Sequence, residues 1–137
     1  MADSFQLEIV SPEKLVVRDS AQELQIPGRN GYLGVLPGHA PLITELGAGE
    51  LTYRSVAGQS HRFSLAWGFA EVLPDRVTVL AETVESADEI DVPRAQQSLH
   101  DAEESLKSAH EEEEFTRGID NIQRAQARLD VARKKET

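Results

Sequence analysis

The chain has 137 residues, of which 14 are Lys or Arg and 24 are Asp or Glu, so its formal net charge is −10. This length allows about one to one and a half ordinary domains. Because the chain contains no cysteine, disulfides and thiolate metal sites are excluded. Its acidic charge opposes the phosphate contacts that dominate nucleic-acid binding, and we expect no nucleic-acid partner.

The hydropathy pattern gives no sign of export or of membrane insertion. The first residues lack the basic segment and apolar run that mark a signal peptide. No stretch approaches the roughly 20 apolar residues that a membrane-spanning helix needs. We therefore expect a soluble chain.

Residues 1–87 alternate apolar and polar side chains in short runs, which indicates strands with one buried and one exposed face. The clearest runs are residues 5–10, 23–26, 61–67 and 76–81. Glycine and proline turns separate the runs about every eight to twelve positions, a spacing typical of antiparallel sandwiches. We predict a β-sandwich domain of about eight to ten strands. The domain shows no helical pattern long enough for a crossover, which argues against a doubly wound nucleotide-binding fold.

Residues 28–39 are rich in glycine and superficially suggest a phosphate-binding loop. The segment lacks the Lys-Ser or Lys-Thr pair of a P-loop, and no predicted helix follows it whose amino terminus could face an anion. A tight hairpin with closely approaching strands is therefore the better interpretation.

Residues 88–137 carry a helical pattern instead, with apolar side chains at steps of three and four positions. The two series are Val92, Ala95, Leu99, Ala102, Leu106 and Ala109, then Phe115, Ile119, Ile122, Ala125, Leu129 and Ala132. Asp91 fits the N-cap of the first helix, with Pro93 in its first turn. We predict an antiparallel α-helical hairpin. Because many of these side chains are alanine, the hairpin buries little apolar area and suits an element that opens.

The sequence offers no recognisable catalytic machinery. Its four histidines are scattered, and His100 and His110 on the first predicted helix are ten positions apart rather than at the i, i+4 spacing of a zinc pair. No serine lies in a Gly-x-Ser-x-Gly motif. We expect a chain that is not an enzyme by itself, with neither a catalytic residue nor a metal site.

The last predicted helix is basic although the chain as a whole is acidic. Residues 115–135 contain six basic and two acidic side chains. Arg117, Arg124 and Arg128 stand at steps of seven and four, so they share one helix face. Two interpretations remain open: a solvated face with intrahelical pairs such as Asp120 with Arg124, or a surface that binds an acidic protein partner or a polyphosphate.

Four segments occur in a characteristic order before and at the start of the hairpin. They are residues 31–42 (Gly-Tyr-Leu-Gly-Val-Leu-Pro-Gly-His-Ala-Pro-Leu), 67–72 (Trp-Gly-Phe-Ala-Glu-Val), 77–82 (Val-Thr-Val-Leu-Ala-Glu) and 90–95 (Ile-Asp-Val-Pro-Arg-Ala). In combination with the hairpin, these segments resemble the epsilon subunit of bacterial and chloroplast F-type ATP synthases, called delta in mitochondria. The resemblance covers nearly the whole chain.

The resemblance implies a non-catalytic central-stalk subunit that couples rotation of the c-subunit ring to ATP synthesis. Its sandwich packs on gamma and touches the ring, with Tyr32 and His39 as the implied contact residues. Family members often carry an acidic residue at the position of Tyr32 and Gly-Gly at the positions of Trp67 and Gly68. Membrane contact is implied only through the Fo sector. The implied location is the cytoplasmic face of a bacterial membrane or the stromal face of a thylakoid, since no transit peptide is present.

The resemblance also implies that the hairpin is regulatory. Folded against the sandwich it permits turnover; extended along gamma it reaches the catalytic alpha and beta subunits and impedes ATP hydrolysis. Arg117, Arg124 and Arg128 then face an acidic helix-turn-helix of the beta subunit. A marginally stable hairpin suits this role, because a switch needs two states separated by only a few kcal/mol.

A weak ATP site is a further implication of the resemblance. Residues 90–95 match the Ile-Asp-x-x-Arg-Ala motif of family members whose folded hairpin binds ATP. The implied site residues are Glu85, Ile90, Asp91, Arg94, Ala95, Arg124 and Arg128. Asp101 stands where those relatives carry another arginine, which weakens the hold on phosphate by about tenfold to a hundredfold. ATP is expected only as a weak regulatory ligand and no cofactor is required; alternatively, Asp91 only caps a structural helix.

Two other classes of protein fit the same architecture. A stand-alone adaptor could use a sandwich and a hairpin without any motor, and an independent nucleotide sensor could use the arginine face for phosphate. Co-purification with alpha, beta and gamma subunits would contradict both alternatives.

Overall fold

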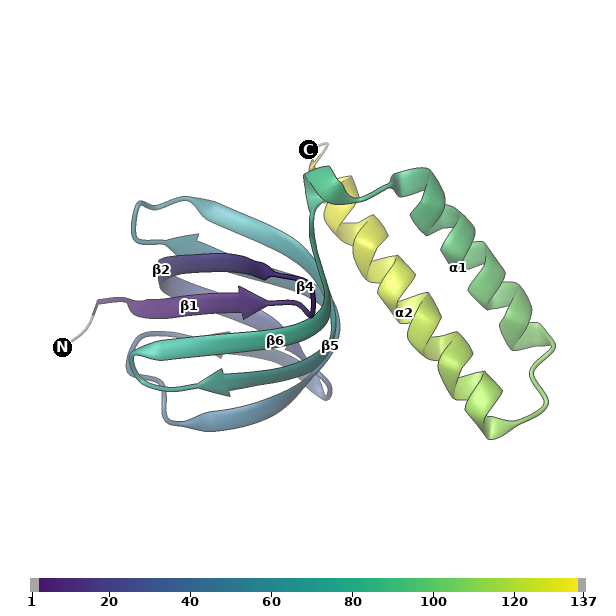
Figure 1. Cartoon of the computed structure of the whole chain (residues 1–137), viewed down its shortest axis with the longest axis horizontal. Helices are drawn as coiled ribbons and strands as arrows, with labels where there is room; N and C mark the ends of the chain where they lie inside the picture. Colours follow the sequence, from purple (N-terminus) through teal and green to yellow (C-terminus); the bar gives the residue numbers. More distant parts are fainter. Residues whose placement is uncertain (1–2, 136–137) are drawn as a thin grey trace.

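The computed structural model describes residues 3–135, without the side chains of residues 134 and 135. Six strands precede a helical hairpin (Figure 1). The elements are β1 (Phe5–Val10), β2 (Leu15–Gly28), β3 (Gly31–Val35), β4 (Leu42–Ser55), β5 (Ser60–Val72), β6 (Arg76–Ser86), the short 3-10 helix η1 (Ala87–Glu89), α1 (Val92–Lys107) and α2 (Glu112–Lys135). The predicted hairpin limit at residue 137 and the charges of Lys134 and Lys135 lie outside the described part.

The predicted β-sandwich is confirmed, and the strands neighbour one another in the order β1-β6-β5-β4-β2-β3. Because β1 also pairs with β2, five of these strands form a closed ring, and β3 extends from β2. A ring with an odd number of strands cannot be antiparallel throughout. The exception is the pair of β1 and β6, which run parallel.

The core fills the interior of this ring. Its largest fully buried side chains are Phe5, Leu7, Ile9, Leu24, Ile26, Leu46, Leu51, Leu65, Val35, Val72, Val77 and Val79. Most of them are β-branched or leucine side chains, which suit the pleated surface of a sheet. The alternation in residues 1–87 therefore identified the inward-facing positions correctly within each short run.

The prediction of eight to ten strands was wrong in number, because long strands change their inward face part-way along. In β5, Phe63 and Leu65 point into the core before the middle, whereas Ala70 and Val72 do so after it. Between them Trp67 adopts φ 58° and Gly68 φ 138°. A change of face within one strand reads as the end of one strand and the start of another, because the side-chain period in a regular strand is two.

The helical hairpin is confirmed, and its first helix begins as predicted. The Asp91 carboxylate accepts a hydrogen bond from the Arg94 amide at 3.1 Å, and a proline lies in the first turn. Small residues of the two seams, such as Ala102 and Ala125, are buried. Helix α2 lies between α1 and the sandwich and contacts β4 and β5 (Figure 1).

Candidate functional site

Both α2 and the sandwich contribute small side chains to the surface between them. Ala48 on β4 lies directly opposite Ala66 on β5, and Ala66 is 1% exposed. On α2, Ala127 and Val131 are also buried. A cleft of about 470 Å³ remains between the two parts, so α2 fits the sheet loosely.

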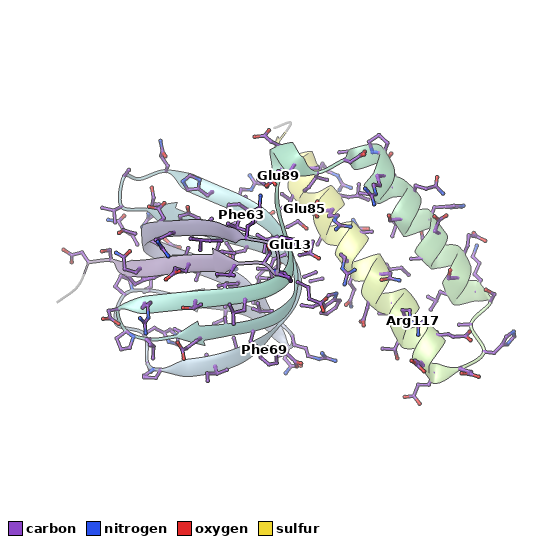
Figure 2. All side chains as sticks on the ribbon, in the orientation of Figure 1. Glu13, Phe63, Phe69, Glu85, Glu89 and Arg117 are labelled. Carbon is purple, nitrogen blue, oxygen red and sulfur yellow. The ribbon has the colours of Figure 1, made fainter. Side chains whose placement is uncertain are left out.

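Two ion pairs join α2 to β6 across this surface. Arg128 Nε donates to Glu85 Oε1 at 2.5 Å, and Arg124 Nη2 donates to Glu82 Oε2 at 3.4 Å. Figure 2 shows Glu85 beside the carboxyl-terminal half of α2. The predicted pair of Asp120 with Arg124 is not formed, because Arg124 turns to the strand instead.

Arg117 stands apart from these two arginines. It lies toward the other end of α2, away from Glu85 (Figure 2), where it pairs with Glu113 of its own helix at 3.4 Å. The three arginines that share one helix face therefore have different partners. Arg117 has the intrahelical pairing of a solvated face, whereas Arg124 and Arg128 bind the sandwich.

The residues of the predicted ATP site fall into two groups. Glu85, Arg124 and Arg128 come together at the contact of α2 with β6. Ile90, Asp91, Arg94 and Ala95 form the start of α1, where Asp91 acts as the N-cap and Ile90 and Ala95 are buried.

A groove of about 290 Å³ runs between the two helices near these groups. Arg124 and Arg128 line it from α2, and Ser98 and Asp101 line it from α1. Arg94 precedes Ser98 by four positions and so lies one turn away on the same helix face. Within the described residues, Arg124 Nε is buried without a hydrogen-bond partner. The groove thus offers cations suited to phosphate, whereas Asp101 opposes it.

Tyr32 and His39, the implied ring contacts, lie in different settings. Tyr32 is 56% exposed, lines the cleft that faces α2, and accepts a hydrogen bond from the Glu50 amide at 3.1 Å. His39 lies in the loop after β3, where its Nδ1 is 2.7 Å from the Ala40 carbonyl oxygen. The neighbouring Gly38 amide bonds to the Pro74 carbonyl at 2.8 Å and ties this loop to the β5–β6 turn.

The connection between sandwich and hairpin is held by Glu89. Its Oε1 accepts hydrogen bonds from the Ser86 amide at 3.1 Å and from the Ser86 hydroxyl at 3.0 Å. These bonds favour the charged carboxylate and lower the pKa of Glu89 below its usual value. The connection is thereby held by local polar contacts together with a small apolar cluster, in which Ile90 packs against Val131 and Ala132 of α2.

An exposed apolar row on the outer face of β4, β5 and β6 was not found from the sequence. Ile43, Phe69 and Leu80 are 71%, 55% and 52% exposed. Phe69 lies directly opposite Leu80 in the paired strands, and Ile43 is opposite Glu71, two positions further along β5. We refer to these three side chains as the apolar row. The signal was present in the sequence as apolar residues out of phase with the buried positions.

Both parts of the chain match known sequence families. Residues 4–87 match the family described as the beta-sandwich domain of the ATP synthase delta/epsilon chain, and residues 88–133 match its long alpha-helix domain. The chain belongs to the ATP synthase delta/epsilon family. The resemblance stated from the sequence motifs is thereby confirmed.

Curated relatives of this family are similar along almost the whole chain. The ATP synthase epsilon chain of Syntrophobacter fumaroxidans is 47% identical over 98% of this chain and 99% of its own length. That of Koribacter versatilis is 60% identical over 80% of this chain and 76% of its own. In fold, the chain is similar to one in the cryo-EM structure of Euglena gracilis mitochondrial ATP synthase, with TM-score 0.83, 20% identity, and coverage of 96% of this chain and 82% of that chain.

Membership in the delta/epsilon family makes the chain a non-catalytic subunit of the ATP synthase complex. Among the residues described, no group of three or more His, Cys, Asp or Glu side chains is arranged to hold a metal ion. None of the helices in that part combines the length and apolar character needed to cross a membrane.

Proposed function

We propose that the chain helps to transmit rotation of the c-subunit ring through gamma to the catalytic alpha and beta subunits, and that the apolar row is its contact with gamma. Three large apolar side chains, each more than half exposed, lie together on adjacent strands. Such patches mark protein interfaces. The complex would sit on the cytoplasmic face of the membrane, and this subunit would meet the bilayer only through Fo.

The experiment that tests the contact replaces Phe69 with glutamate. Burying an unpaired carboxylate in an apolar interface is strongly unfavourable, so we expect binding to a complex of alpha, beta and gamma that lacks this subunit to weaken at least about tenfold. Val56 in the β4–β5 turn is 51% exposed and provides a matched control. Val56→Glu should bind normally; equal losses in both variants would contradict the assignment of the apolar row.

The hairpin is proposed to restrain ATP hydrolysis when it leaves the sandwich. Its loose fit on β4 and β5, through small side chains and ion pairs, supports a contact that opens. Removing residues 88–137 should preserve binding to gamma and raise the rate of ATP hydrolysis in reconstituted complexes. If binding were lost, or hydrolysis unchanged, this division of roles would be wrong.

ATP is a candidate regulatory ligand, favoured by the groove that Arg124 and Arg128 line. Arginine grips phosphate oxygens through two parallel hydrogen bonds. Both guanidinium groups are already engaged by β6, and Asp101 adds repulsion, so binding is weak. Calorimetric titration with ATP should give an affinity that rises in Asp101→Arg and vanishes in Arg94→Ala. No heat from either the wild type or Asp101→Arg would leave Asp91 as a structural cap alone.

A further inference from the structure

We propose that the ion pairs Arg124–Glu82 and Arg128–Glu85 act as a latch that favours the closed hairpin without any ligand, and that a partner which binds these two arginines favours the release of α2 from β6. The consequence for ATP hydrolysis rests on the proposed regulatory role of the hairpin. The stabilisation of the closed hairpin in the isolated chain does not depend on that regulatory role.

One latch pair, Arg128–Glu85, is more shielded than the helical pair Arg117–Glu113, whereas Glu82 of the other latch pair is 64% exposed. The side chains of Arg128 and Glu85 are 26% and 27% exposed, whereas those of Arg117 and Glu113 are 66% and 81% exposed. Shielding from water and salt strengthens an attraction between opposite charges. The Arg128–Glu85 pair therefore contributes more than a surface pair, and the pair of Arg124 adds to it.

The strand geometry is what presents both carboxylates to α2. Residues three apart in a regular strand point to opposite faces of the sheet. In β6, however, Ala81 and Val84 both point into the core, so the strand changes its inward face between them. Glu82 and Glu85 consequently both reach α2. The change of face thus creates an acidic pair whose members lie on the same side.

Helix α2 matches this pair with its own spacing. Arg124 and Arg128 are four positions apart and share one helix face, and each engages one of the two carboxylates. A helix shifted by one turn would present only one arginine to the pair. The two-by-two match therefore fixes where α2 lies on the sheet as well as holding it there.

The apolar contribution to closing is small enough for the latch to matter. The small residue Ala127 is buried beside the sheet, Val131 packs instead with Ile90 at the connection, and a cleft of about 470 Å³ separates other parts of the surfaces. Because exposed and half-exposed ion pairs are each worth about 0.2–1 kcal/mol, the two pairs together change the closing equilibrium by about two- to thirtyfold. An acidic partner segment offers the same arginines equivalent carboxylates. The closed and the partner-bound states thus exclude one another.

The absence of cysteine in the sequence allows the equilibrium to be measured directly. Cysteines introduced at the exposed positions Gln59 and Glu103 would carry spin labels on the sandwich and on α1, and electron resonance would give the fractions of near and far labels in the full chain. Reversing the charge of both arginines, Arg124→Glu with Arg128→Glu, should shift closed molecules to open ones by at least about tenfold, because repulsion replaces attraction.

The decisive variant adds Glu82→Arg and Glu85→Arg to that double reversal. It restores opposite charges across the interface and should return the closed fraction to near its original value. Arg117→Glu reverses a charge on the same helix with no partner on the sandwich, and it should leave the closed fraction unchanged. If the double reversal opened the hairpin no more than Arg117→Glu, or if the fourfold exchange failed to close it, the latch would be refuted.

A second measurement separates the latch from the proposed regulatory role. The variant with Glu82→Gln and Glu85→Gln weakens the latch but leaves both arginines free for a partner. In reconstituted complexes, we expect this variant to inhibit ATP hydrolysis at a concentration about two- to thirtyfold lower than the wild type requires. Opening in the labelled chain without any change in hydrolysis would support the latch and refute regulation by the hairpin.

Discussion

Among the glycines, Gly68 is the one that leaves the least room for an added side chain. It adopts φ 138° within β5, and a Cβ built on it would lie 1.9 Å from the Leu80 carbonyl oxygen and 3.0 Å from the Ala81 Cα. Both atoms belong to the backbone of β6, which is paired with β5 on either side of this point. Alanine at position 68 would therefore have to push two paired strands apart by about 1 Å, at the expense of their ladder hydrogen bonds.

Gly31 supplies a matched control for this substitution. Its φ is 137°, yet a Cβ built on it meets nothing within 4 Å. Gly31→Ala therefore introduces the backbone strain alone, about 1–3 kcal/mol, and both substitutions restrict the unfolded chain equally. Gly68→Ala adds the clash to that strain. We expect a total loss above about 4 kcal/mol, a large part of the roughly 5–15 kcal/mol that stabilises an ordinary domain.

The assay is urea unfolding of the full chain, followed by circular dichroism and by the fluorescence of Trp67, the one tryptophan of the sequence. Gly31→Ala should lower the free energy of unfolding by about 1–3 kcal/mol with an unchanged slope. Gly68→Ala should lose more than about 4 kcal/mol, or fail to fold. If the two variants lay within about 1 kcal/mol of each other, the clash with β6 would be refuted.

Two further predictions concern the core and the hairpin. Burial, together with the hydrogen bond that the Tyr53 hydroxyl donates to Asp19 at 3.0 Å, raises the pKa of Tyr53 above its usual value of 10.0; the resulting stability is complete below pH 10 and is lost as the pH rises further. Tyr53→Phe should therefore cost about 1 kcal/mol at neutral pH yet flatten the loss above pH 10, and urea midpoints measured across this range would test it. Gly118 lies inside α2, where the atom nearest to an added Cβ would be the flexible Leu106 Cδ1, at 3.1 Å, and the Leu106 Cβ and Cα would lie at ordinary contact distances of 3.6 and 3.8 Å. Gly118→Ala should raise the melting temperature through about 0.5–1 kcal/mol of helix propensity, and a fall would mean that Leu106 cannot move aside.

The hairpin could be predicted because its signals are local. The N-cap of Asp91 and the spacing of alanines in the two helices depend on neighbours within a few positions, and these neighbours are visible in the sequence. The number of strands depended instead on contacts between distant parts of the chain. Trp67 adopts a positive φ that is unfavourable for a bulky side chain, and only the surrounding sheet stabilises it there. No sequence feature within a few residues of Trp67 predicts this conformation.

In the candidate site too, the features set by local sequence could be predicted, whereas those set by the folded sheet could not. The shared face of Arg124 and Arg128 followed from helix periodicity, and the resemblance to ATP-binding relatives brought Glu85 near them. Glu82 was missed because regular alternation places residues 82 and 85 on opposite faces of a strand. Their common orientation arises from the change of face in β6, a property of the closed sheet. The partner of each arginine therefore became evident only once the sheet and the helix were placed together.

The composition of the contact between α2 and the sheet follows from what a releasable helix needs. Each fully buried leucine or phenylalanine would add about 1.5–3 kcal/mol to the closed state, and a few of them would shift the equilibrium beyond what a competing partner could reverse. Ala48, Ala66 and Ala127 keep that contribution small. Ion pairs supply the remainder in a form that can be exchanged, because any correctly spaced pair of carboxylates satisfies Arg124 and Arg128 equally well. The charged residues, rather than the alanines, therefore determine which partner can open the hairpin.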